Sequence, residues 1–241
     1  MKNHPAFQHT DHRPWPLPET NWRWQQQWND LVFVHWEVDP NWLRSRIPEG
    51  LEIDLHDGKA WLGIVPFSMK GVTLRKLPAP GFLCDFPEIN LRTYVKRDGK
   101  QGVWFFSLDI TQWTAVWIAR TFFHLPYYKA QIATQNQGNQ IEYHFRRNPL
   151  EFHASYTPET RVQPEKDSFE NWATERYCLY SDNKKGDLFR AEIHHRQWPL
   201  QAASIEVHTN TMLNHWPVGC MHPSVLYSKT IDVVVYPLEK I

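Results

Sequence analysis

The chain has 241 residues, enough for one sizeable domain, and its 26 Lys and Arg residues balance its 26 Asp and Glu residues. Because nucleic-acid binders and polybasic membrane-surface proteins need an excess of positive charge, this balance argues against both classes. A hydrophobic fraction of 41% and a charged fraction of 22% also exclude a disordered chain. The unusual feature is an aromatic fraction of 15%, with 13 Trp residues.

Residues 1–20 carry several His and Pro residues but no apolar stretch of the kind that a signal peptide contains. We expect them to form a flexible or surface-draped arm before a single domain that spans residues 21–241. No apolar run approaches the about 18–20 residues that a membrane-spanning helix requires. Cys84, Cys178 and Cys220 are odd in number and widely spaced, which is typical of a protein of the reducing cytoplasm. The sequence does not indicate an oligomeric state.

Short strands separated by turns dominate the first half of the chain. Asp57-Gly58 and Asp98-Gly99 are strong hairpin signals. Asp39 is followed by Pro40, a pattern that predicts a capped short helix ending near Arg46. The segment Lys70–Pro87 contains five Gly and Pro residues and predicts a long loop, functional or mobile. The strands expected in this half are residues 31–38, 51–55, 60–67, 88–96 and 102–110.

The second half begins with a predicted helix over residues 112–123, capped by Thr111. Trp113, Val116 and Trp117 are spaced as one apolar face of that helix. Leu125-Pro126 ends it, because a residue before proline avoids the helical region. A second short helix is expected from residue 167 or 168 to 174. The remaining strands are expected on both sides of residues 137–139 and at 150–156, 175–181, 188–195, 201–207 and 224–236. This pattern predicts mostly antiparallel β structure with a few packed helices.

The strand over residues 88–95 contains the most informative pattern. Alternation along a strand places Glu88, Asn90, Arg92 and Tyr94 on one face. An isolated strand would turn such a face to water, but the partner strand over 102–110 is apolar on both of its faces. The polar stripe is therefore expected to face an enclosed space, where a buried carboxylate or guanidinium needs a partner. The partner is either a bound ligand or, in a purely structural alternative, a Glu88–Arg92 ion pair.

Further candidates lie elsewhere in the chain. Arg120 falls on the apolar stripe of the helix, where it either extends along the surface to water or clamps a carboxylate. Tyr127 and Tyr128 follow the helix at a corner that could line a cleft. Arg176 lies in a third polar patch. His195 shares the apolar face of its strand and is expected to point inward, although a lone inward His is more often a hydrogen-bonded core residue.

Familiar catalytic motifs are absent. The sequence contains no nucleophile elbow, phosphate-binding loop, dinucleotide fingerprint or HExxH motif. His208, His215 and His222 recur at intervals of seven, but prolines and turns interrupt them. We therefore expect no metal and no cofactor.

Taken in order, several segments resemble a known family. They are Leu31–Trp36, Ile47–Leu51, Asp57–Trp61, Val65–Phe67, Glu88–Val95, Leu125–Tyr127, Glu175–Tyr177 and His195–Leu200. This set resembles the YqjF-like family of bacterial proteins over nearly the whole chain. That family is similar to proteins of the acetoacetate decarboxylase-like fold. The resemblance implies an α+β architecture, mostly antiparallel β, in which a curved sheet closes into a cone-shaped barrel around an internal pocket, with a few packed helices.

The resemblance also bears on the chemistry. Acetoacetate decarboxylase forms a Schiff base on a lysine whose pKa is lowered by a second lysine, and glutamates assist from the pocket wall. Glu88 occupies the place of one such glutamate by resemblance. The two lysine positions after Pro126 hold Tyr127 and Tyr128, and Lys129 comes one residue late, which on a strand means the opposite face. This departure argues against decarboxylation through an imine.

Two functional hypotheses follow. In the first, a small anionic or carbonyl ligand is bound and converted by a lyase or a related enzyme, a hydratase or isomerase, without a metal. The residues assigned to catalysis are Glu88, Tyr127 and Tyr128, and those assigned to substrate binding are Arg92, Tyr94, Arg120, Arg176 and His195. In the second, the protein binds a small molecule without catalysis, and Glu88 and Arg92 form a structural pair.

Overall fold

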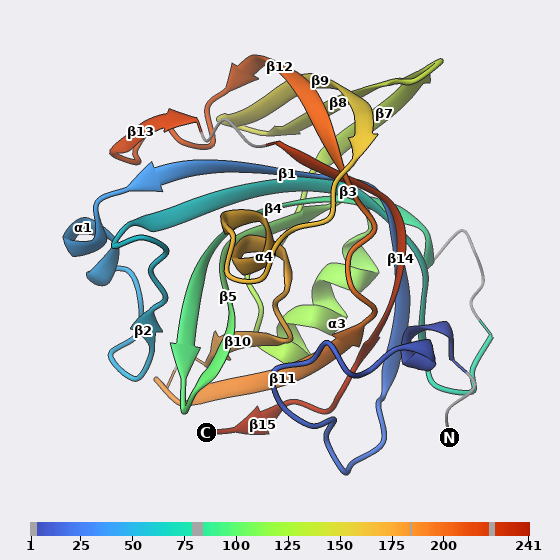
Figure 1. The fold of residues 1–241 in the computed structure, drawn as a ribbon, viewed down its shortest axis with the longest axis vertical. Helices are drawn as coiled ribbons and strands as arrows, with labels where there is room; N and C mark the ends of the chain where they lie inside the picture. The colour runs from blue at the N-terminus through green and yellow to red at the C-terminus, as the bar shows by residue number, and fades with distance from the viewer. Residues whose placement is uncertain (1–3, 79–83, 184, 222–224) are drawn as a thin grey trace.

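The computed structural model describes residues 4–78, 84–183, 185–221 and 225–241, and it consists mainly of antiparallel strands (Figure 1). Its elements in chain order are η1 (Pro5–Gln8), β1 (Trp24–Val38), α1 (Pro40–Arg44), β2 (Glu52–Ile53), β3 (Ala60–Leu74), β4 (Phe86–Arg97), β5 (Lys100–Ile110), α3 (Trp113–Phe123), β6 (Tyr127–Lys129), β7 (Gln131–Gln137), β8 (Gln140–Arg147), β9 (Leu150–Arg161), α4 (Phe169–Thr174), β10 (Cys178–Asp182), β11 (Leu188–His195), β12 (Leu200–Asn210), β13 (Val218–Met221), β14 (Leu226–Val235) and β15 (Glu239–Lys240).

Strands β1, β3, β4, β5, β10, β11 and β14 form a closed barrel, because β14 pairs with both β11 and β1. The neighbouring pairs are antiparallel except β5 with β10, which is parallel. From β14 the sheet continues through β12, β9, β8 and β7 as an extension beside the barrel. In the view of Figure 1, α3 is seen in the opening of the ring of strands. The expected curved sheet that closes into a barrel is confirmed. None of the helices in the described ranges is long and apolar enough to cross a membrane.

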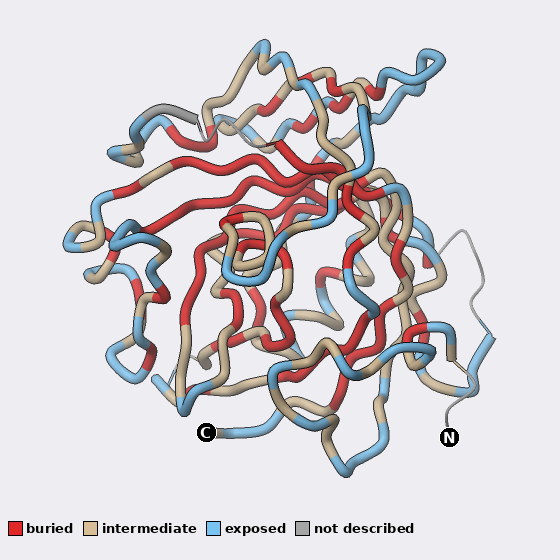
Figure 2. Tube along the Cα trace, in the orientation of Figure 1, coloured by how far each residue is buried: buried red, intermediate tan, exposed pale blue. Residues whose placement is uncertain are grey.

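Long stretches of β1, β3 and β4 are buried, as the red tube in Figure 2 shows. Side chains such as Phe33 and Phe67 belong to the apolar cluster that includes Val116 of α3. Val34, which follows Phe33 on β1, and Ile89 on β4 belong to a second cluster, which includes residues of the extension sheet. Because successive side chains of a strand point to opposite faces, one strand contributes to both clusters. Burial on both faces explains the apolar run Leu31–Val34 of β1, whereas β4 alternates apolar with polar residues.

Several strands differ from the sequence-based expectations. β3 continues to Leu74 and β4 begins at Phe86, so the predicted loop Lys70–Pro87 is shorter than expected, and residues 79–83 of it lie outside the described residues. Gly71 lets β3 continue, because it adopts a φ of 62° that favours glycine, and its N–H donates to Asp85. The expected turn at Asp57-Gly58 forms, closed by an antiparallel bridge between His56 and Lys59, but β2 pairs with β4 rather than with β3. The Asp98-Gly99 hairpin between β4 and β5 is confirmed.

The orientation of α3 was also predicted incorrectly. Trp113 and Trp117 are 63% and 59% exposed, whereas Val116 is buried. The inward side of the helix instead carries smaller residues, including Ala115 and Ala119, which line a cavity. These smaller side chains face the cavity, and the bulky Trp113 and Trp117 side chains face outward. The N-cap residue is Gln112 rather than Thr111.

The N-terminal arm drapes over the barrel at β11. The guanidinium of Arg13 forms an ion pair with Glu192 at 2.9 Å, and the two side chains are only 2% and 3% exposed. Arg13 also donates to the carbonyl oxygen of Ile193 at 2.6 Å. The indole N–H of Trp15 donates to Glu192 at 2.9 Å, and Phe7 stacks on His194 with 5.1 Å between ring centroids. A buried charged pair therefore fixes the described part of the arm.

Arg13→Ala tests how much this contact stabilises the fold. Removing one partner of a buried ion pair typically costs about 3–5 kcal/mol, and we expect the lower end of that range because Lys100 still contacts Glu192. Urea denaturation measures the change. The matched control is Lys59→Ala, which breaks the exposed Lys59–Glu37 pair and should cost less than about 1 kcal/mol. Equal losses in the two variants would show that the arm contributes little to stability.

Candidate functional site

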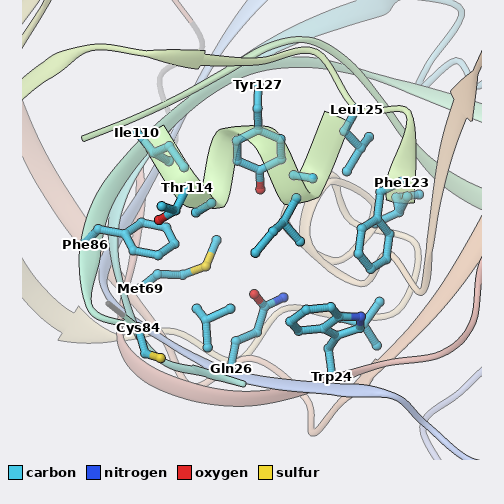
Figure 3. A pocket seen from close by; sticks show the side chains of 16 residues that line it. Trp24, Gln26, Met69, Cys84, Phe86, Ile110, Thr114, Phe123, Leu125 and Tyr127 are labelled. Carbon is cyan, nitrogen blue, oxygen red and sulfur yellow. The ribbon is translucent and has the colours of Figure 1, made fainter. Parts of the chain in front are cut away.

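Two adjoining cavities lie inside the barrel. The outer cavity has a volume of about 330 Å³ and is lined by α3 and by residues of β1, β3, β4 and β14 (Figure 3). The inner cavity is smaller, about 80 Å³, and contains most of the polar side chains. The residues that line both cavities are Gln26, Met69, Leu125, Tyr127 and Leu179. The two cavities are therefore direct neighbours that share a wall.

The polar stripe of β4 faces the inner cavity, as the alternation predicts. Glu88, Asn90 and Arg92 line that cavity. Ile89 and Leu91, which alternate with them, belong to the apolar cluster on the other side of the sheet. The stripe is enclosed because β4 lies between β3 and β5 in the closed barrel. The expectation that these polar groups face an enclosed space rather than bulk water is confirmed.

Glu88 is held as a buried, neutral carboxyl group. The hydroxyl of Tyr127 donates to its Oε2 at 3.0 Å, and the Asn90 amide donates to its Oε1 at 3.4 Å. Burial raises the pKa of Glu88 to about 8, the two hydrogen bonds partly oppose the rise, and the charge of Asp109 adds to it. At neutral pH the carboxyl therefore carries a proton, which makes it a potential acid catalyst.

Tyr127 reaches the site because of how α3 ends. The helix ends at His124, which adopts the left-handed conformation with a φ of 53°. After Leu125-Pro126 the chain forms β6, which pairs in parallel with β5 and places Tyr127 opposite Leu108. Figure 3 shows its hydroxyl pointing into the outer cavity. Burial and the neighbouring Glu88 raise the pKa of Tyr127 well above its usual value, so it is a neutral hydrogen-bond donor.

Arg92 is a buried cation without an anion. Its side chain is 9% exposed, and its guanidinium lies over the rings of Phe33 at 5.3 Å and Tyr94 at 5.7 Å. Within the described ranges it forms no hydrogen bond and no ion pair, and its Nε is buried without a partner. The structural alternative of a Glu88–Arg92 ion pair is therefore not observed, since Glu88 bonds to Tyr127 and Asn90 instead.

Arg176 lines the same cavity, but some of its hydrogen-bond donors already have partners in the protein. It forms a buried ion pair with Asp54 through Nη1, and its Nε donates to the Trp172 carbonyl at 2.6 Å. Its Nη2 is buried without a partner. Burial lowers the pKa of Arg176, Asp54 opposes this effect, and the nearby charge of Arg92 adds to it. Two guanidinium groups and one carboxylate leave this end of the cavity with a net positive charge.

His195 also lines the inner cavity, as a neutral ring. Its Nδ1 donates to the Arg196 carbonyl at 2.7 Å, and the ring stacks on Tyr177 at 4.7 Å. Burial lowers its pKa to about 4. Tyr94, in contrast, is fully buried outside both cavities, with its hydroxyl 2.5 Å from Nε2 of His35. It lies beneath Arg92 and contacts that guanidinium with its ring.

Arg120 and Tyr128 are not part of either cavity wall. Arg120 is exposed, and its Nε donates to the Tyr127 carbonyl at 2.6 Å. Tyr128 points away from Tyr127 and contacts the guanidinium of Arg147 at 4.2 Å. Lys129 is exposed, and no lysine is among the described residues that line the cavities.

Gln26 is a site residue that the sequence reasoning missed. It lies on β1 between Trp24 and Trp28 and lines both cavities. The expected strand began only at Leu31, because residues 25–27 are three consecutive glutamines. The available signal was the alternation of Trp24, Gln26 and Trp28, which places one polar side chain among aromatic ones on a single face.

Replacing Glu88 should change how stability depends on pH. Because the pKa of Glu88 is about 8 in the folded state and 4.5 in its reference state, the folded protein binds more protons between these values. Stability then falls as pH rises through that window, by at most about 1.4 kcal/mol per pH unit for one proton. Glu88→Gln should flatten this fall in urea titrations from pH 5 to 9. The exposed control Glu37→Gln should follow the wild type, and a parallel curve for Glu88→Gln would mean that Glu88 is ionised.

Comparison with solved structures supports the fold. Acetoacetate decarboxylase from Legionella pneumophila aligns with a TM-score of 0.65 at 14% identity, covering 95% of this chain and 92% of that one. The enduracididine biosynthesis enzyme MppR complexed with pyruvate aligns with a TM-score of 0.66 at 12% identity, covering 95% and 93%. An acetoacetate decarboxylase-like enzyme from Sphingomonas wittichii RW1 gives 0.63 at 12%, covering 96% and 98%. At these identities the likeness shows the fold alone.

Sequence comparison identifies the family. YqjF from Bacillus subtilis (strain 168) is 41% identical over 230 residues, which cover 93% of this chain and 95% of YqjF. The DUF2071 family, described as an uncharacterized conserved protein, matches residues 25–232. The match to DUF2071 spans most of the chain and the match to YqjF nearly all of it, so this chain, which has an acetoacetate decarboxylase-like fold, belongs to the DUF2071 family and is a relative of YqjF.

Proposed function

We propose that the inner cavity binds the carboxylate of a small carbonyl compound and that the protein acts on it as a lyase or a related enzyme. The observation that carries this proposal is the guanidinium of Arg92, which is buried without a carboxylate or hydrogen-bond partner in the described ranges. A buried charge is costly unless it is paired, and a bound anion would supply the pair. The free Nη2 of Arg176 gives the same anion a second donor.

In this proposal Glu88 is the proton donor. The substrate carboxylate binds to Arg92 and Arg176, which places its carbonyl group toward Glu88 and Tyr127. Glu88 donates its proton to the carbonyl oxygen while a C–H bond of the adjacent carbon breaks; the electron pair of that bond forms the C=C bond of an enol, and the π pair of the C=O bond stays on the oxygen. The released proton returns to the Glu88 carboxylate, which keeps the hydrogen bonds from Tyr127 and Asn90. No lysine is needed at any step.

A non-catalytic binding protein is the second candidate. It is favoured by the hydrogen bonds of Glu88, since both of its oxygens already have protein donors. In that case Glu88 only maintains the shape of the cavity, and Arg92 alone selects an anion.

Three further observations support the proposal. One structural neighbour, MppR, is complexed with pyruvate, which is an oxo acid. Cys84 and Cys178 are both free thiols, which fits a protein of the reducing cytoplasm. The chain's neutral balance of charge and the positive end of the inner cavity together favour a small anion over a nucleic acid.

A thermal-shift screen with pyruvate and other small oxo and carboxylic acids tests the proposal. We expect at least one acid to raise the Tm of the wild type and of the control Arg46→Ala, whose side chain is exposed. Arg92→Ala should weaken binding by at least about tenfold, since charged hydrogen bonds contribute about 1.5–3 kcal/mol. No shift in folded wild-type protein, or an equal shift in Arg92→Ala, would contradict the assigned anion site.

The two candidate functions differ in Glu88→Gln, which keeps the shape of the side chain. If Glu88 is the acid, this variant should bind the acid found in the screen but convert it at least about a hundredfold more slowly. Product formation by the wild type is followed by nuclear magnetic resonance. A ligand that binds tightly yet is never converted by the wild type would favour the binding protein.

A further inference from the structure

We infer that the ligand carries an apolar tail, a hydrocarbon chain or an aromatic ring, and that this tail occupies the outer cavity. This inference rests on the proposed function, because it takes the polar head of the ligand to lie in the inner cavity. The volume of about 330 Å³ is four times that of the inner cavity, at about 80 Å³, and lies in the range of small-molecule sites. A compound as small as pyruvate would leave it empty.

The chemistry of the outer wall selects an apolar group. None of the described residues that line the outer cavity carries a charge, and Gln26, Thr114 and Tyr127 are its main polar side chains. The rest of the wall is aliphatic, aromatic or sulfur-containing, as Figure 3 shows for Met69 and Phe86. A hydrated or charged group placed there would lose its water without gaining new partners, whereas a hydrocarbon gains free energy by leaving water.

The polar groups at the boundary fix which way the ligand lies. Figure 3 shows the hydroxyl of Tyr127 and the amide of Gln26 pointing into the cavity from opposite sides. Both residues also line the inner cavity, where Glu88 and Arg92 lie. An amphipathic acid therefore has one orientation that satisfies the whole site: carboxylate at Arg92, carbonyl group near Glu88 and Tyr127, and tail toward α3.

The outer cavity exists because of the small inward side chains of α3. Ala115 and Ala119 lie one helical turn apart and line the cavity together with Ile118. A larger side chain at residue 119 would fill the space that the tail needs. This makes α3 the element that sets the permitted length of the tail.

A homologous series of straight-chain 2-oxo acids, from pyruvate to 2-oxododecanoate, tests the inference by calorimetric titration. Each methylene group buried in the outer cavity should tighten binding to the wild type by about fourfold until the cavity is full. In Ala119→Phe this gain should disappear, while pyruvate binds as it does to the wild type. The matched control is Thr121→Phe, which adds the same ring on the exposed side of α3 and should keep the gain.

A second variant tests the same inference in case Ala119→Phe does not fold. Ile118→Ala enlarges the outer cavity and should shift the tightest-binding acid to a longer chain. If pyruvate binds but affinity does not depend on chain length, the tail inference is wrong and the proposed function stands. If long acids gain equally in the wild type and in Ala119→Phe, the tail lies elsewhere and the inference is again wrong. If no member of the series binds to folded wild-type protein, the proposed function fails as well.

A second cluster of polar side chains lies on the exposed face of the extension sheet, apart from the residues that line the cavities. Glu142 and His144 on β8 and His153 on β9 share this face, and His144 is directly opposite His153 in the register. The residues that alternate with them, Tyr143 and Phe152, are buried in the apolar core. The cluster is therefore fixed on a well-packed sheet rather than on a loop.

The geometry points to a binding site for a divalent transition metal such as Zn²⁺ at this cluster. Oε1 of Glu142 lies 3.0 Å from Nε2 of His153 and 3.7 Å from Nε2 of His144. The ligand atoms of all three residues lie within 4.8 Å of one another. In a tetrahedral zinc site, bonds of about 2.0–2.1 Å separate the ligand atoms by about 3.3 Å, so small side-chain rotations suffice.

His208 on β12 supplies a possible fourth ligand. The register between β12 and β9 shifts between Val207 and Thr209, next to His153. The ring of His208 lies 4.4 Å from that of His153, and its Nε2 is 2.9 Å from the hydroxyl of Ser155. Imidazole and carboxylate ligands suit zinc, and three or four of them match the number found in its protein sites.

Zinc titration of metal-free protein, prepared without a polyhistidine tag, tests this site by calorimetry. We expect one equivalent to bind to the wild type and His153→Ala to lower the affinity by at least about tenfold, because even outer-shell changes can cost that much. His215→Ala, which removes an exposed histidine elsewhere, is the matched control. Circular dichroism confirms that each variant is folded. No zinc uptake by the wild type, or equal uptake by His153→Ala, would overturn the proposal.

Discussion

The burial of one polar strand face is the constraint on which the site depends. Because the barrel closes and the extension sheet covers its other side, the side chains of the β4 stripe are largely shielded from bulk water. Glu88 and Arg92 respond differently to this burial. A carboxyl group can take up a proton and become neutral, as the raised pKa of Glu88 shows, whereas a guanidinium stays charged in proteins. The same wall therefore holds a proton donor and an uncompensated cation.

The second feature of the site is its division into a polar and an apolar part. Tyr127 lies at the division because α3 ends at His124 and the chain turns at once into β6. Two contacts fix this corner from outside: Arg120 donates to the Tyr127 carbonyl, and the hydroxyl of Ser181 donates to the Phe123 carbonyl at 2.8 Å. Arg120 and Ser181, which lie outside the cavities, thus help to position Tyr127 in the cavity wall. Arg120 contacts this corner from outside the two cavities.

Local patterns in the sequence predicted part of this arrangement. The Asp98-Gly99 turn and the alternation from Glu88 to Tyr94 are properties of adjacent residues, so the hairpin and its inward polar face could be found. The partner of Arg176 could not, because Asp54 is 122 residues away in the chain. The face of α3 was misjudged for a related reason: both of its sides are apolar, and only the space inside the barrel decides which one is buried.

This chain shares the barrel fold of acetoacetate decarboxylase-like proteins, but the side chains in its cavity wall differ from those that an imine mechanism needs. An imine mechanism needs a lysine in the wall, and in the described part of this chain Tyr127 lines the cavity while Lys129 is exposed. A phenol with a strongly raised pKa cannot replace an amine as a nucleophile, but it can donate a hydrogen bond to a neighbouring carboxyl group. In the proposed function the proton donor is therefore Glu88 on β4 rather than a residue of the strand after α3. Under that proposal, a barrel of this fold acts on an oxo acid by proton transfer, with the anion held at Arg92 and no covalent bond to the protein.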